Sequence, residues 1–169
     1  AARYIHQNSP RANNRFLTIA CASIQSEIME ELLFGQEVDG KISPGLFEKA
    51  HGGTLFFDEV AELPIGTQAK ILRVLVDQVF TRVGGKNIVR VNCRIISSTS
   101  KDLAMEIEKG YFKEELFHRF NVVPIKIPSL EERILDISLL SAYFIEWLSK
   151  SEGLQNKQLT DASIRKLQN

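Results

Sequence analysis

Two adjacent carboxylates follow an apolar stretch in the middle of the chain. Residues 54–57, Thr-Leu-Phe-Phe, are followed directly by Asp58 and Glu59. Carboxylates at the end of a buried strand are costly to desolvate unless a cation offsets their charge. A hydrated Mg²⁺ on a nucleotide would do so, with one carboxylate facing the metal and its neighbour facing an attacking water. The alternative is a solvated turn in which Asp58 caps the next short helix.

Three small hydroxyl residues end a second strand-like stretch. The run over 94–99 closes with Ser98 and Thr99, and Ser100 follows. These side chains could hydrogen-bond a terminal phosphate or the water beside it. They could equally cap a helix that begins near Asp102.

Lys113 and Arg119 lie in a short stretch of helical type over 111–120. An arginine that projects from one subunit can stabilise charge on a phosphate bound by its neighbour. The alternative for both residues is an ordinary surface cation. The three histidines of the chain have no carboxylate or nucleophile at a diagnostic spacing, so we assign them no catalytic role.

The composition is that of an ordinary folded domain. The 169 residues include 21 Lys+Arg and 21 Asp+Glu, with 44% hydrophobic and 25% charged residues, which excludes intrinsic disorder. The zero net charge argues against a nucleic-acid-binding module, because neutralising phosphates needs a basic surplus. No apolar run reaches the roughly 18–20 residues of a membrane span. Cys21 and Cys93 are isolated from each other in the sequence. We expect both to be buried thiols in a reducing compartment. We therefore expect a cytoplasmic domain with no membrane contact.

Strand-like and helix-like stretches alternate along most of the chain. Strands are expected at 16–21, 54–57, 94–99 and 122–127, and helices at 1–7, 27–34, 68–79, 102–109, 134–150 and from 160 onward. A hairpin is expected over 80–91 and a polar loop over 36–45. This alternation predicts an α/β domain with a largely parallel sheet, whose ligands bind beyond the carboxyl ends of the strands. Near residue 128 the pattern changes to helix only, which predicts a domain boundary there.

Taken together, these segments resemble the AAA+ ATPase domain of bacterial enhancer-binding proteins, the activators of sigma-54 RNA polymerase. The matching stretches run in the same order from about residue 3 to the C-terminus, and they include Glu31-Leu-Leu-Phe-Gly35, Gly45–Val60, Ile71–Leu75, Arg82-Val-Gly-Gly85, Arg94–Thr99, Glu115–Val122 and Leu130–Ile137. The loop over residues 36–45 and the segment Leu75-Val-Asp-Gln78 resemble the NtrX type of nitrogen-related response regulator.

The resemblance implies a role for the acidic pair and the hydroxyl residues. Asp58 would be the Walker B residue that orders Mg²⁺, and Glu59 would polarise the hydrolytic water. Thr99 and Ser100 would occupy the sensor I position. The implied cofactors are therefore ATP and Mg²⁺.

The resemblance also implies a fold and an assembly. The fold would be a three-layer αβα P-loop NTPase sandwich over residues 1–128, with the start of a helical lid over 129–169. Members of the family work as rings, typically hexamers, with ATP at the subunit interfaces. Lys113 and Arg119 would then stand where the family has two arginines that act on the neighbouring subunit's nucleotide.

The sequence departs from the family pattern in five places. Family sequences carry the first strand and the phosphate-binding loop just before the position of Ala1, so both would be missing here. The loop 36–45 lacks the Gly-Ala-Phe-Thr-Gly-Ala sequence that grips sigma-54. Ala20 replaces the usual Asn that holds the Walker B glutamate, and Lys113 replaces the first arginine. The chain stops at Asn169, before the motif with which the lid senses nucleotide.

We therefore expect an ATP-binding AAA+ domain of an NtrX-like transcriptional response regulator, present as a fragment that is inactive alone because the phosphate loop is absent. A receiver domain for a sensor kinase and a helix-turn-helix domain for DNA would lie outside this chain. The altered loop argues against a sigma-54 contact. The alternatives are a non-catalytic AAA+ scaffold, used for oligomerisation or repression without ATP hydrolysis, and an inactive relic.

Overall fold

The computed structural model describes residues 1–153, 155 and 157–168. The chain divides into two compact units, Ala1–Val123 and Pro124–Asn169. Among the described residues, no helix is both long and apolar enough to cross a membrane.

The larger unit is built on a parallel sheet of three strands. In the sheet order these are β1 (Phe16–Ala20), β4 (Thr54–Asp58) and β7 (Arg94–Ser97). β1 and β4 are paired over their full length, so that Ala20 lies opposite Asp58 at the carboxyl end. The strands predicted from the apolar runs at 16–21, 54–57 and 94–99 are thus confirmed, and their carboxyl ends meet at one edge of the sheet.

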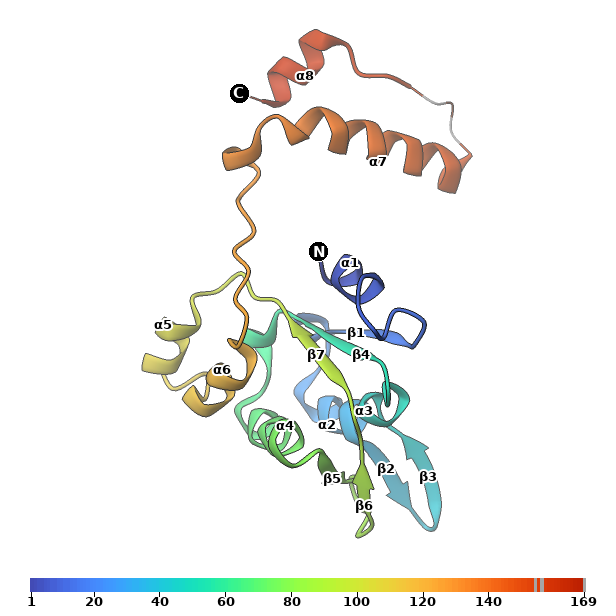
Figure 1. Ribbon diagram of the computed structural model, residues 1–169, viewed down its shortest axis with the longest axis vertical. Coiled ribbons are helices and arrows are strands. Elements are labelled where there is room, and N and C mark those ends of the chain that lie inside the picture. Colours follow the sequence, from blue (N-terminus) through green and yellow to red (C-terminus); the bar gives the residue numbers. More distant parts are fainter. Residues whose placement is uncertain (154, 156, 169) are drawn as a thin grey trace. The chain divides into compact units, whose positions relative to one another are not determined.

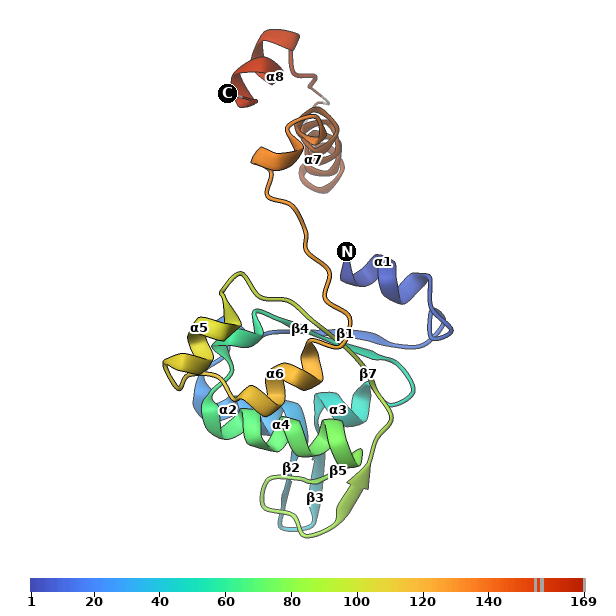
Figure 2. The ribbon, with the colours of Figure 1, turned by 60° about the vertical axis from the view of Figure 1, so that its left-hand side comes forward.

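Helices cover the two faces of this sheet (Figures 1 and 2). The helical elements of the larger unit are α1 (Ala2–Gln7), α2 (Ser26–Phe34), α3 (Leu46–Lys49), α4 (Ile65–Asp77), α5 (Leu103–Glu108) and α6 (Glu114–Phe120), with the 3-10 turns η1 (Cys21–Ser23) and η2 (Val60–Glu62). The expected helices at 1–7, 27–34, 68–79 and 102–109 all have a counterpart here.

The alternating side chains of β4 connect the layers. On one face, the buried Thr54 hydroxyl lies 2.9 Å from Nδ1 of His6 in α1. On the other face, the fully buried ring of Phe57 packs against Phe47 of α3 and Phe120 of α6. Because successive strand residues point to opposite faces, this apolar strand is covered on both sides. The result is the three-layer α/β arrangement expected from the sequence.

Two hairpins extend from the sheet and lie side by side in Figures 1 and 2. The predicted hairpin is confirmed as β5 (Val79–Thr81) paired with β6 (Ile88–Arg90). The prediction of a plain loop at 36–45 was wrong, because β2 (Gly35–Val38) pairs with β3 (Lys41–Pro44).

Close backbone contact explains the unexpected hairpin. Gly35 has φ +75°, and a Cβ there would lie 2.4 Å from the carbonyl oxygen of Ser43. The glycine therefore allows the two strands to start their pairing directly after α2. A bridge between Gln36 and Val83 then joins this hairpin to the chain between β5 and β6.

The strand predicted at 122–127 is absent. This segment is exposed, begins with a turn and a bend at residues 122–123, and pairs with no described strand. Pro124 has no N–H, and Pro128 ends the segment. Apolar alternation alone does not make a strand where no neighbouring backbone pairs with it.

The smaller unit is helical. It contains η3 (Glu131–Arg133), α7 (Asp136–Glu152) and α8 (Asp161–Leu167). The spacing of Ser129 and Glu132 predicts a capping box, and the structure forms it: Ser129 N–H donates to Glu132 Oε2 (2.8 Å) and Glu132 N–H donates to Ser129 Oγ (3.3 Å). The sequence over 153–158 predicts a linker, and residues 154 and 156 of it lie outside the described residues.

Candidate functional site

The acidic pair lies where β4 ends, beside the end of β7. Ser98 directly follows β7, and its hydroxyl donates to Asp58 Oδ1 at 2.6 Å. The Ser98 hydroxyl oxygen also accepts the backbone N–H of Glu59 at 3.3 Å. Both acidic residues are half-buried. One hydroxyl of the neighbouring strand therefore touches both members of the pair.

Glu59 has an unusual backbone. Its φ and ψ are 59° and 62°, the left-handed region, which costs roughly 1–2 kcal/mol for a residue with a Cβ. Its carboxylate is held by Ser100, whose N–H and Oγ both donate to Glu59 Oε2, at 2.9 and 3.0 Å. Strained backbone of this kind is found where the surrounding structure forces a side chain into a set position.

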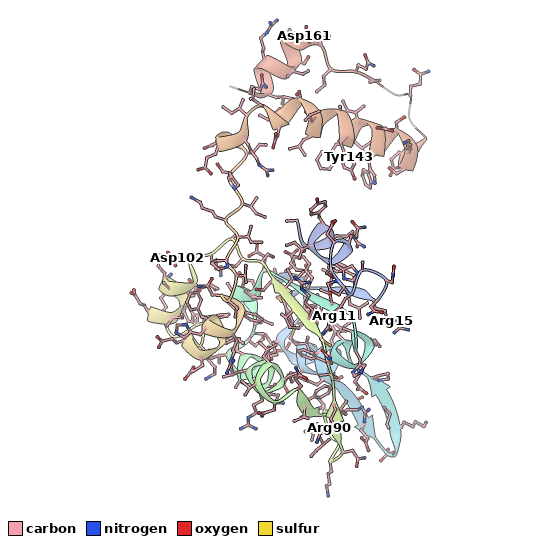
Figure 3. The ribbon with its side chains drawn as sticks, in the orientation of Figure 1. Arg11, Arg15, Arg90, Asp102, Tyr143 and Asp161 are labelled. Carbon is pink, nitrogen blue, oxygen red and sulfur yellow. The ribbon has the colours of Figure 1, made fainter. Side chains whose placement is uncertain are left out.

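The two structural alternatives for these residues are not what the structure shows. Asp58 caps no helix: η2 follows Glu59 and has no side-chain cap. The cap of α5 is Asp102, which lies at the start of that helix in Figure 3 and accepts the N–H groups of Ala104 and Met105. The hydroxyls of Ser98 and Ser100 are thus free of capping and contact the acidic pair instead.

Thr99 lies apart from the other predicted contacts. Its exposed hydroxyl accepts the N–H of Lys101 at 3.1 Å within the same loop. It makes no hydrogen bond to Asp58 or Glu59 in the described residues. Of the two residues assigned to the sensor I position, the structure brings Ser100 to the acidic pair and leaves Thr99 outside it.

The two predicted cations sit at opposite ends of α6. Lys113 is the residue before the helix, and its N–H donates to Oε1 of the buried Gln68 at 2.8 Å. Arg119 lies in the last turn, exposed to solvent. In the described part of the chain, neither side chain forms an ion pair, so both positive charges are available to a partner.

The field around the acidic pair is negative. The pKa of the Cys21 thiol is raised to about 12, mainly by burial and next by the charge of Asp58, with smaller effects from Glu59 and Glu62. The only cation paired close by in the described residues is Lys101, whose ammonium bonds Glu62 Oε1 at 2.8 Å. That hydrogen bond raises the pKa of Lys101. A cationic ligand would be attracted to this edge of the sheet.

Ala20 lies at the end of β1, the strand that pairs with β4 on the side opposite β7. It is paired with Asp58 at the end of β1, and its side chain is a methyl group. It therefore donates no hydrogen bond to Glu59. Ser100, on the other side, supplies the donors that hold the glutamate.

A phosphate-loop spacing occurs once in the chain, at Gly35, Gly40 and Lys41. Residue 42 is Ile, whereas the phosphate loop has Ser or Thr after its lysine. The structure places this stretch in the β2–β3 hairpin, where Asp39 and Gly40 form the turn with positive φ. A phosphate loop joins a strand to the N-terminus of a helix, so this match is a hairpin turn.

Comparison with known proteins agrees with this architecture. The Sigma-54 interaction domain family matches residues 1–126. The nitrogen assimilation regulatory protein NtrX of Azorhizobium caulinodans is 47% identical over 169 residues, covering 99% of this chain and 37% of that protein. A crystal structure of NtrX from Brucella abortus has a TM-score of 0.94 and 47% identity, covering 99% of this chain and 38% of that one. The structure of the same NtrX in complex with ATP has a TM-score of 0.90 and 46% identity, covering 99% of this chain and 39% of that one.

The fold is that of a three-layer α/β domain with an acidic pair at the carboxyl edge of its parallel sheet. Within that class, the chain belongs to the Sigma-54 interaction domain family, the AAA+ domain of NtrX- and NtrC-like response regulators. It spans a little over a third of the length of the NtrX relative.

The sequence does not predict two of the contacts in the site region. It indicates Ser98 as a phosphate contact or a helix cap, not as the partner of the acidic pair, and it places Gln68 only at the start of a helical stretch. The position of Ser98 directly after β7, whose neighbour β4 ends at the acidic pair, could have indicated its contact. No sequence signal marks Gln68, whose role depends on loops far along the chain.

Proposed function

We propose that this chain is the ATP-binding segment of a longer, NtrX-like transcriptional response regulator, and that its acidic pair serves ATP hydrolysis. The observation that carries the proposal is the hydrogen-bonded arrangement of Asp58 and Glu59 with Ser98 and Ser100 at the carboxyl edge of a parallel sheet. The family relationship and the ATP complex of a similar NtrX support it.

The donor set suits Mg²⁺ bound to a nucleotide. Mg²⁺ takes one or two carboxylates, keeps several waters and uses phosphate oxygens for the rest of its shell. Within the described residues there is no cluster of three metal-ligating side chains. Asp58 would hold the metal through the oxygen that Ser98 leaves free, and the metal would supply charge neutralisation at the phosphates.

Glu59 suits the role of a base for water. One of its oxygens, Oε2, is occupied by two donors from Ser100. The other oxygen has no hydrogen-bond donor among the described residues and can accept a proton from a water. Positioning by Ser100 would keep this carboxylate directed along the sheet edge.

The exposed Arg119 and the half-buried Lys113 suit a neighbour's nucleotide. Arg119 has no carboxylate partner in the described residues, and its planar guanidinium can bind a phosphate in two places. We propose that the complete protein forms a ring, with a hexamer as the expected size, in which Arg119 reaches the adjacent subunit. Lys113 would add a positive charge, but its ammonium cannot bind a phosphate through two parallel hydrogen bonds as a guanidinium does.

The experiment is ATP hydrolysis by the complete protein that contains this chain. Glu59→Gln should lower the turnover rate by about 10²–10⁴-fold, because it removes a general base while keeping the shape. Glu108→Gln is the matched control, since Glu108 is exposed on α5 and forms no ion pair in the described chain. No hydrolysis by the unaltered protein, with ATP still bound, would favour the non-catalytic scaffold.

The role of Arg119 is tested separately by mixing subunits. Arg119→Ala protein and Glu59→Gln protein should each be inactive alone, and mixed rings should recover part of the rate, because some interfaces then contain both residues. Arg90→Ala is the control, as Arg90 is an exposed cation on β6 (Figure 3). Equal rates for Arg119→Ala and the unaltered protein would contradict the proposed role.

A further inference from the structure

Ser98 contacts the end of β4 and the residues that follow it through three separate groups. Its hydroxyl donates to Asp58 and accepts from the N–H of Glu59, as described above. Its carbonyl accepts the N–H of Val60 at 2.9 Å, and its N–H donates to the carbonyl of Phe57 at 2.9 Å. Ser98 is therefore bonded to each of the four residues from the last part of β4 into η2.

The hydroxyl is the group that links the side chain of Asp58 to the backbone of Glu59. A serine hydroxyl has one donor hydrogen and two acceptor lone pairs, so it can make both contacts at once. The 2.6 Å contact to Asp58 is in the range of charge-assisted hydrogen bonds, which are roughly twice as strong as neutral ones. A methyl group in its place would leave Asp58 free to turn and the Glu59 N–H without this acceptor.

We infer that Ser98 is a positioning residue for the metal-binding carboxylate of Asp58, and that it also stabilises the left-handed turn at Glu59. This inference rests on the proposed function of Asp58. Ser98 would not touch the metal; it fixes which carboxylate oxygen faces the ligand. Residues that orient a metal ligand in this way typically contribute 10- to 100-fold to metal affinity.

The neighbouring serine offers a matched control. Ser97 is the last residue of β7, directly before Ser98, is half-buried like Ser98, and its hydroxyl has no hydrogen-bond partner in the described residues. Ser97→Ala removes the same atom one residue earlier without touching the acidic pair. Ser98→Thr keeps the hydroxyl and suits a strand end, so it is the rescue variant.

The experiment measures Mn²⁺ affinity of the complete protein saturated with a non-hydrolysable ATP analogue. Ser98→Ala should bind Mn²⁺ about 10- to 100-fold more weakly than the unaltered protein. Ser97→Ala should stay within about twofold, and Ser98→Thr should recover most of the loss. Affinity of Ser98→Ala within twofold of the unaltered protein would overturn the inference.

A second measurement needs no nucleotide. The Glu59 amide should exchange with solvent at least about tenfold faster in Ser98→Ala than in Ser97→Ala, because its acceptor is gone, while the amides of β1 keep their protection. General loss of protection would mean an unfolded variant, and Ser98→Thr then decides the outcome. If the unaltered protein binds no Mn²⁺ with the analogue, the proposed function fails; if it binds and Ser98→Ala binds equally, only the role of Ser98 fails.

Discussion

Replacement of the buried Gln68 would release the segment that carries Lys113. Gln68 is fully buried on α4, and its Nε2 donates to the carbonyls of Leu63 (2.8 Å) and Tyr111 (2.9 Å). Its Oε1 accepts the N–H of Lys113 at 2.8 Å. One side chain thus connects η2, α4 and the loop between α5 and α6.

The cost of Gln68→Ala follows from these three partners. The contact with Leu63 is buried, and leaving such a carbonyl unpaired costs about 1–3 kcal/mol. The other two contacts are partly buried and contribute about 1 kcal/mol each. The expected loss is about 3–5 kcal/mol, a large share of the 5–15 kcal/mol typical of a domain.

Urea unfolding followed by circular dichroism measures this loss. With a slope of about 2 kcal/mol per molar urea, the midpoint should fall by roughly 2 M. Arg73→Ala is the control, because Arg73 is exposed on the same helix and should change stability by less than about 0.5 kcal/mol. A loss below about 1 kcal/mol for Gln68→Ala, or an unchanged exchange rate of the Lys113 amide, would refute the hydrogen-bond reasoning.

Three further changes test other parts of the fold. Arg82→Lys should lower the free energy of unfolding in urea by about 1.5–3 kcal/mol, because the paired hydrogen bonds from the guanidinium to the Glu48 carboxylate (Nε to Oε1, 2.9 Å) are lost. An unchanged urea midpoint would contradict this. The pKa values of the Cys21 and Cys93 thiols are raised, mainly by burial, to about 12 and 11, above the value of 9.0 for a free thiol. Because the unfolded chain then loses these protons first, the free energy of unfolding should fall as pH rises from 9 toward 11. Alkylation near pH 9 should accordingly be slow until urea is added, and fast labelling of the folded chain would disprove burial. Asp102→Ala should cost about 1 kcal/mol by removing the cap of α5, with faster exchange confined to that helix as the check.

Much of the larger unit was predictable from local patterns. The apolar run at 54–57 predicted a strand buried on both faces, and Phe57 is indeed fully buried against two helices. The glycine pair at 84–85 predicted the turn between β5 and β6, where Gly84 has φ +75°. These signals are local because a strand run, a turn glycine or a helical face needs few neighbours to be recognised.

Two predictions failed because they depend on which backbone segments pair. The 36–45 stretch looked like a loop, yet Gly35 lets its backbone pair and the bridge to Val83 joins it to a hairpin far along the chain. The 122–127 stretch looked like a strand, yet it pairs with no described strand. Strand formation needs a partner backbone, which a local pattern does not contain.

For the site, the sequence alone determined the ingredients: an acidic pair after one apolar strand, hydroxyl residues after another and two cations around residues 113–119. Only the tertiary structure decided which of them meet. The parallel pairing of β4 with β7 brings Ser98 to Asp58 and Ser100 to Glu59, while Thr99 turns back to its own loop. The physical reason is that hydrogen bonds of about 3 Å depend on strand register and backbone angles, which arise from the packing of the whole unit.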